Sequence, residues 1–231
     1  MHSEKHTLGT FDSLLGRLRD DFLMMASLTE RNLQNSMQGL LKRDNDLCNQ
    51  TIVDEEEIDQ IEKQVDQDAV ELLIRFQPVA SDLRQVLCTT KLSGNLERIS
   101  DQAVNIAKLT RKLNREPLLE EIHHLEPMFH EAIGMVRDAI RSFVNYDIDL
   151  ANTIKPRDKK LDHINREAAA LFMTRMQEKP DRIRDLVNLL LIGRNLERIG
   201  DHAKNIAEEA VYVTSAEDIR HSGSPNPPGE P

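Results

Sequence analysis

The sequence of 231 residues has few aromatic residues, no tryptophan and only two cysteines. Aromatic residues make up 3% of the chain and hydrophobic residues 39%, so the core must consist mainly of aliphatic side chains. Cys48 and Cys88 form no C-x-x-C pair, which argues against a disulfide framework and favours buried, reduced thiols. Prolines are rare before the last residues, and Leu, Ile, Ala, Glu, Lys, Arg and Gln are abundant. This composition predicts an all-α fold.

The sequence also lacks long apolar runs and an excess of basic residues. No apolar stretch reaches about 18 residues, and the first ten residues are polar, unlike a signal peptide. We therefore expect a cytoplasmic protein with no direct insertion into the membrane. The formal net charge of −10 argues against nucleic acid as a partner, because binding to its backbone depends on lysine and arginine. An acidic surface instead favours cations and basic patches on partner proteins.

Two copies of one segment organise the chain. Residues 95–107 read NLERISDQAVNIA and residues 195–207 read NLERIGDHAKNIA, with ten of thirteen positions identical. In each copy the apolar residues recur at intervals of three and four, which places them on one face of an α-helix. These residues are Leu96, Ile99, Ala103, Ile106, Leu196, Ile199, Ala203 and Ile206. A repeat at this spacing predicts two related halves.

The remaining apolar pattern divides each half into three helices. The first helix is expected from about Thr10, the third to start at Pro78, and the third and sixth to carry the repeated segment. Because the links are short, neighbouring helices should be antiparallel, which predicts two pseudo-symmetric three-helix bundles with six helices in all. The expected boundaries are 7–114 for the first bundle, 117–214 for the second, and 215–231 for a disordered Pro-rich tail.

Each repeated segment carries two acidic residues four positions apart. Glu97 and Asp101, like Glu197 and Asp201, lie one helical turn apart and away from the apolar face. Like charges at this spacing destabilise a helix by roughly 0.2–0.5 kcal/mol. The arginine after each glutamate offers one compensation, which would make these faces ordinary solvated surfaces. The repetition favours a hard cation between the carboxylates, such as Mg²⁺, Ca²⁺, Mn²⁺ or oxidised iron.

A second set of acidic pairs appears when the second helix is aligned with the fifth, 103 residues later. Glu55 and Asp59 then correspond to Asp158 and Asp162. Each bundle would thus offer four carboxylates on adjacent helices, enough to hold one metal ion or a small cluster. Two alternatives stay open. The first pair belongs to the acidic run 54–59, which can simply favour a helix start, and the second lies among basic residues that could form surface salt bridges with it.

Several other motifs carry less weight. Residues 120–124 contain Glu-x-x-His twice, but a di-iron bundle needs a second such segment, which is missing. His202 could add a metal ligand, yet the first repeat has Gln102 there. Pro156 should bend the fifth helix unless a helix begins there. Phosphate-binding glycine loops and nucleophile motifs are absent, so we expect no enzymatic activity.

The two NLERI-[SG]-D segments, their preceding acidic pairs and QPVASDLR at Gln77–Arg84 resemble the PhoU family over about residues 7–214. The resemblance implies two three-helix bundles with multinuclear metal clusters at E/D-x-x-x-D motifs, the metal being iron, manganese, magnesium or zinc. It also implies a cytoplasmic protein, often a homodimer, that negatively regulates phosphate uptake and the phosphate-starvation response. Such proteins link the ATPase of the phosphate-specific ABC transporter to a membrane sensor histidine kinase.

Transferred position by position, the family motif marks eight metal ligands in this chain. They are Glu97, Asp101, Glu197, Asp201, Glu55, Asp59, Asp158 and Asp162. The chain departs from the usual pattern at Ser100, which replaces a glycine, at Glu55, where aspartate is common, and at Pro156. Two other classes of function remain open at this point, a metal-dependent enzyme on a helical bundle and a structural adaptor without metal.

Overall fold

The computed structural model describes residues 2–217 and 219, and the chain in these ranges is helical without a β-strand. This confirms the expected all-α fold with six long helices. The long helices are α1 (His2–Leu41), α2 (Asn45–Phe76), α3 (Ala80–Leu113), α4 (Glu126–Asn145), α6 (Ile154–Glu178) and α7 (Ile183–Ser215). The short ones are α5 (Ile148–Asn152) and two 3₁₀ turns, η1 (Glu120–Leu125) and η2 (Pro180–Arg182). Most of the predicted disordered tail lies outside the described residues.

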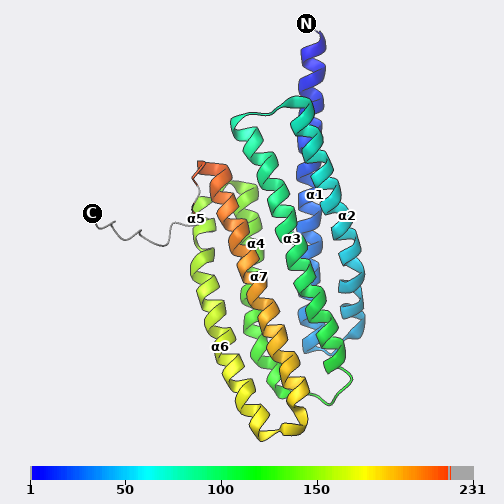
Figure 1. Cartoon of the computed structure of the whole chain (residues 1–231), viewed down its shortest axis with the longest axis vertical. Coiled ribbons are helices and arrows are strands. Elements are labelled where there is room, and N and C mark those ends of the chain that lie inside the picture. The colour runs from blue at the N-terminus through cyan, green and yellow to red at the C-terminus, as the bar shows by residue number, and fades with distance from the viewer. Residues whose placement is uncertain (1, 218, 220–231) are drawn as a thin grey trace, which may run out of the picture.

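The long helices run alternately in opposite directions along one axis (Figure 1). Helices α2, α3, α7 and α6 lie side by side in that order, and α1 and α4 lie behind them. We call α1, α2 and α3 the first bundle, and α4, α6 and α7 the second bundle. Helix α3 packs against α7 as extensively as against α2, so the buried apolar residues form one continuous core across both bundles.

The apolar face of each repeated segment forms the centre of this core. All eight residues predicted to line these two faces, four on α3 and four on α7, have no exposed surface. Cys48 and Cys88 are also buried and unpaired, as expected. Burial raises the pKa of the Cys48 thiol to about 11. The helical periodicity of the sequence therefore identified the core correctly.

Two aspartates begin helices at equivalent points of the two halves. The carboxylate of Asp44 accepts hydrogen bonds from the N–H groups of Asp46 and Leu47 at the start of α2. The carboxylate of Asp147 accepts one from the N–H of Leu150 at the start of α5. Both satisfy N–H groups that have no partner within a helix, as short acidic side chains at such turns commonly do.

Three helix starts differ from the prediction. Helix α1 begins at His2 rather than near Thr10, and no proline interrupts the chain there. Pro78 lies outside α3, which begins at Ala80 after an extended residue. The predicted fifth helix is broken at Thr153 into α5 and α6, so Pro156 falls in the first turn of α6. A missing N–H costs little at that position, because first-turn N–H groups have no partner within the helix.

Helix α1 approaches the start of α2 closely at Gly39 but has open space beside Gly16. A Cβ atom at Gly39 would lie 2.6 Å from Sγ of Cys48 and 3.1 Å from the backbone oxygen of Asp44, whereas Gly16 has nothing within 4 Å. We expect Gly39→Ala to lower the free energy of unfolding by about 1–3 kcal/mol through overpacking. The control Gly16→Ala should raise it by about 0.5–1 kcal/mol, because alanine favours the helix. Urea unfolding measures both, and the same sign for both would contradict this packing.

Candidate functional site

Five carboxylates gather where α2 packs against α3, and we call them the first acidic face. They comprise the two predicted pairs and one further glutamate: Glu55, Asp59 and Glu62 of α2, with Glu97 and Asp101 of α3. The charge of Glu55 interacts with those of Asp59 and Asp101, and Glu97 interacts with Asp101, Glu62 and Asp59. The structure therefore brings the two predicted acidic pairs of the first bundle into one electrostatic group.

These carboxylates repel one another in a partly buried setting. Burial, followed by the charge of Asp101, raises the pKa of Glu97 to about 7, and its side chain is 15% exposed. Burial and a neighbouring aspartate also raise the pKa values of Glu55 and Glu62. Arg98 compensates weakly, because its guanidinium lies 3.3 Å from Glu97 and 3.4 Å from Asp101 on a side chain that is 62% exposed. Lys108 and Lys63 also act on Glu55 and Glu62, but at all three glutamates burial and neighbouring acidic charge outweigh the positive charges and the net shift of the pKa is upward.

The equivalent surface between α6 and α7 contains a lysine, and we call it the second acidic face. It comprises Asp158, Asp162, Glu197 and Asp201, together with Lys204. The Nζ atom of Lys204 donates to Oδ2 of Asp158 at 2.7 Å and to Oδ1 of Asp201 at 2.8 Å. Burial lowers the pKa of Lys204, but these two hydrogen bonds outweigh it and raise the pKa above its usual value. The ammonium therefore joins the α6 and α7 carboxylates as a charged lysine.

An amide also takes part in the second acidic face. Nδ2 of Asn165, on α6, donates to Oε2 of Glu197 at 2.8 Å. Burial, and then the charges of Asp158 and Asp201, raise the pKa of Asp162. Of the four predicted ligands on this face, three have a direct partner from the chain itself.

The two faces differ at two equivalent positions that the prediction missed. In the alignment that pairs the acidic residues of α2 and α6, Glu62 corresponds to Asn165. In the alignment of the two repeated segments, Val104 corresponds to Lys204. At these six positions the first face has five acidic residues and a valine, and the second has four acidic residues, an amide and an ammonium. Both differences are visible in these alignments, at positions where the two repeats do not share an acidic residue.

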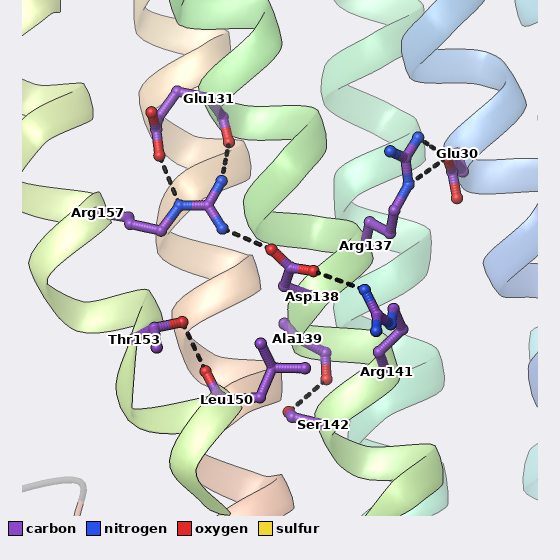
Figure 2. A network of polar contacts seen from close by, with 10 residues as sticks. All are labelled: Glu30, Glu131, Arg137, Asp138, Ala139, Arg141, Ser142, Leu150, Thr153 and Arg157. Carbon is purple, nitrogen blue, oxygen red and sulfur yellow. Dashed lines mark hydrogen bonds and ion pairs between the residues drawn. The ribbon is translucent and has the colours of Figure 1, made fainter. Parts of the chain in front are cut away.

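Arg157, next to Asp158 in the sequence, binds two acidic residues of α4 instead (Figure 2). Arg157 Nε lies 2.6 Å from Oε1 of Glu131 and Nη1 lies 2.8 Å from Oδ2 of Asp138. Lys160 Nζ lies 2.7 Å from Oε2 of Glu131. The alternative in which neighbouring bases neutralise Asp158 is therefore wrong for Arg157 and Lys160, which hold α6 against α4. The same region of α4 reaches the first bundle through an ion pair between Arg137 and Glu30 of α1 (Figure 2).

The histidines considered as metal ligands lie outside both acidic faces. Nδ1 of His202 lies 3.0 Å from Oδ1 of Asn95, so this histidine joins α7 to α3 rather than either acidic face. His123 is 65% exposed, whereas Glu121 beside it is buried and paired with Lys179. In the part of the chain that the structure describes, no three acidic, histidine or cysteine side chains converge as a group able to hold a metal ion. Within the same part, no helix combines the length and the apolar character needed to cross a membrane.

Comparison with known proteins identifies the family. The family model of the PhoU domain matches residues 22–110 and 125–210, once in each repeat. The chain belongs to the PhoU family. The phosphate-specific transport system accessory protein PhoU homolog of Pseudomonas putida is 34% identical over 222 residues, which cover 94% of this chain and 86% of the relative. The PhoU protein of Escherichia coli is 31% identical over 226 residues, which cover 96% of this chain and 92% of the relative.

Solved PhoU structures share the fold. The crystal structure of PhoU from Pseudomonas aeruginosa superposes with a TM-score of 0.87 at 32% identity, covering 90% of this chain and all of the other. PhoU from Streptococcus pneumoniae, described as a phosphate transport system regulatory protein, gives a TM-score of 0.82 at 25% identity, covering 90% of this chain and 99% of the other. The PhoU resemblance recognised in the duplicated acidic segments is thus confirmed.

Proposed function

We propose that this PhoU protein is an accessory regulator of phosphate-specific transport that restrains phosphate uptake and the phosphate-starvation response when phosphate is abundant. The observation that carries the proposal is the match of both repeats to the PhoU domain, with relatives named as transport accessory proteins along most of the chain. The fold supports a binding function. Its buried interior is a continuous apolar core, and the charged residues of both acidic faces, apart from the buried Asp158, are at least partly exposed.

The proposed partners are the ATPase of the phosphate transporter and a membrane sensor histidine kinase, both met in the cytoplasm. Acidic faces suit basic patches on such partners, because complementary charge steers association and fixes orientation. The formal net charge of −10 favours the same kind of contact. A homodimer would present two copies of each face. The proposed role is regulatory binding rather than catalysis.

We further propose that the first acidic face binds a hard cation, with manganese, iron, magnesium and zinc as candidates. The ligand atoms are of the type that such an ion prefers, because Glu55, Asp59, Glu97 and Asp101 offer only oxygen and Glu62 adds a fifth carboxylate. As placed in the structure these side chains do not converge on one point, so binding would draw them together. Burial of Glu97 and the neighbouring charge of Asp101, which together raise the pKa of Glu97, both favour cation binding. A bound cation would cancel that repulsion and hold α2 against α3, since a ligand stabilises the state that binds it.

The test is capture of the transporter ATPase by the tagged full-length chain from its own host cells grown in high phosphate. We expect capture by the wild type and a loss of at least about tenfold for Glu97→Ala with Asp101→Ala, since the cation that orders the contact is then missing. Glu56→Ala with Glu57→Ala is the matched control, because these exposed glutamates lie beside the face and outside it. Mass spectrometry quantifies the captured ATPase.

Each other outcome has a defined meaning. Failure of the wild type to capture the ATPase would overturn the proposed partner. Equal capture by the acidic-face variant, unchanged by a chelator, would support an adaptor without metal. Metal-dependent turnover of a phosphate ester by manganese- or iron-loaded protein would instead support the enzyme alternative.

A further inference from the structure

We infer that Lys204 is the resident cation of the second acidic face, so that this face excludes metal and the chain binds its metal only at the first face. The inference builds on the proposed metal site of the first face and separates the two halves of the repeat. The predicted ligands of the second face do not fit a bound metal ion, because the chain has already placed a positive charge among them.

The position of the ammonium carries the first step of the argument. Lys204 Nζ lies 2.7 Å from Asp158 of α6 and 2.8 Å from Asp201 of α7. A metal ion shared by these carboxylates would occupy the same space between the two helices. A metal ion and the lysine ammonium would repel strongly in so small a space, so metal would bind only after the Lys204 side chain had moved out from between the two carboxylates. The side chain is 26% exposed and hydrogen-bonded at both contacts, which makes its departure costly.

A second, independent position points the same way. Asn165 donates a hydrogen bond to Glu197, which engages a third predicted ligand. Its equivalent in the first bundle is Glu62, a carboxylate that adds negative charge. Both differences between the repeats therefore make the second face less attractive to a cation. The other carboxylate oxygen of Asp158, Oδ1, is buried without a hydrogen-bond partner. It faces the backbone of α7 at Gly200, 3.4 Å from the position that a Cβ atom would take there.

The acidic residues of the two faces are therefore neutralised by different cations, an ammonium of the chain in the second bundle and a bound ion in the first. Lys204 joins α6 to α7 without a bound ion, because its own ammonium bridges Asp158 and Asp201. The carboxylates of α2 and α3 repel one another until a cation arrives. Metal binding would thus stabilise the first bundle and leave the second unchanged. A partner protein would then meet a metal-dependent surface only at the first face.

The experiment measures Mn²⁺ binding to the full chain by calorimetry and elemental analysis, in a background where Glu97→Gln and Asp101→Asn disable the first face. We expect Mn²⁺ binding in this background to be at least about 100-fold weaker than in the unaltered chain. Addition of Lys204→Val, which copies Val104, should create binding at least about tenfold stronger, because the competing charge is gone. Lys159→Val is the matched control, since it removes an exposed lysine of α6 outside the face and should create no site.

The outcomes separate this inference from the proposed metal site. Mn²⁺ binding of unaltered strength in the background with Lys204 intact, or no gain after its removal in a variant that retains the wild-type helical circular dichroism, would overturn the inference. Lys204→Gln repeats the test with a polar side chain should the valine variant fail to fold. If the unaltered chain binds no Mn²⁺ while Lys204→Val does, the role of Lys204 holds and the metal site of the first face fails.

Discussion

Truncation of Leu96 to alanine is expected to lower the free energy of unfolding by about 2–5 kcal/mol, and truncation of Leu196 by a similar amount. Both side chains are fully buried, one on α3 and the other on α7. Each truncation removes apolar contacts and leaves a cavity that the packed helices cannot fill completely. Urea unfolding followed by circular dichroism measures the loss.

The same two helices provide matched controls. Leu87 of α3 is 42% exposed and Leu191 of α7 is 41% exposed, so their truncation should cost much less, within about 1 kcal/mol. Because the core is continuous from one bundle to the other, we expect both core variants to shift one common unfolding transition. Two separate transitions, each sensitive to only one of the two leucines, would show that the bundles unfold independently.

The sequence predicted the local features of this fold well. The apolar faces of the repeated segments follow helical periodicity, and a buried face needs no knowledge of its partner to be recognised. Helix starts at Asp44 and Asp147 were likewise readable, because capping depends on residues a few positions away. The predicted start of the third helix at Pro78 was wrong, because the extended Val79 delays the helix to Ala80.

Contacts between helices were harder to predict. The continuity of the core through α3 and α7 depends on which sides of the two bundles pack together. The repeated sequence carries no information on that contact. The long side chain of Arg157 can reach acidic residues on its own helix or on α4, and only the packed structure shows that it binds Glu131. Likewise, Lys204 was visible in the sequence, but its place between Asp158 and Asp201 required α6 and α7 together.

Neutralising the first acidic face is expected to change metal binding and stability in opposite directions. Glu97→Gln with Asp101→Asn should weaken Mn²⁺ binding by at least about 100-fold, because loss of even outer-shell partners costs 10–100-fold. The same change should raise the free energy of unfolding of the metal-free protein by roughly 1–2 kcal/mol at pH 8. At that pH the wild-type Glu97 is charged although its pKa is raised to about 7, so the fold carries the cost of burying this charge and of its repulsion with Asp101, both of which glutamine removes.

The equivalent change on the second face is the control that makes this result specific. Glu197→Gln with Asp201→Asn removes a charged partner from Lys204 and from Asn165. We therefore expect Mn²⁺ binding to stay at the wild-type level and the free energy of unfolding to fall by about 1 kcal/mol, the typical net value of a lost hydrogen bond. The difference arises because one face has its cation built into the chain and the other does not. Stabilisation by neutralisation at both faces, or loss of Mn²⁺ from both, would show that the two repeats hold charge in the same way.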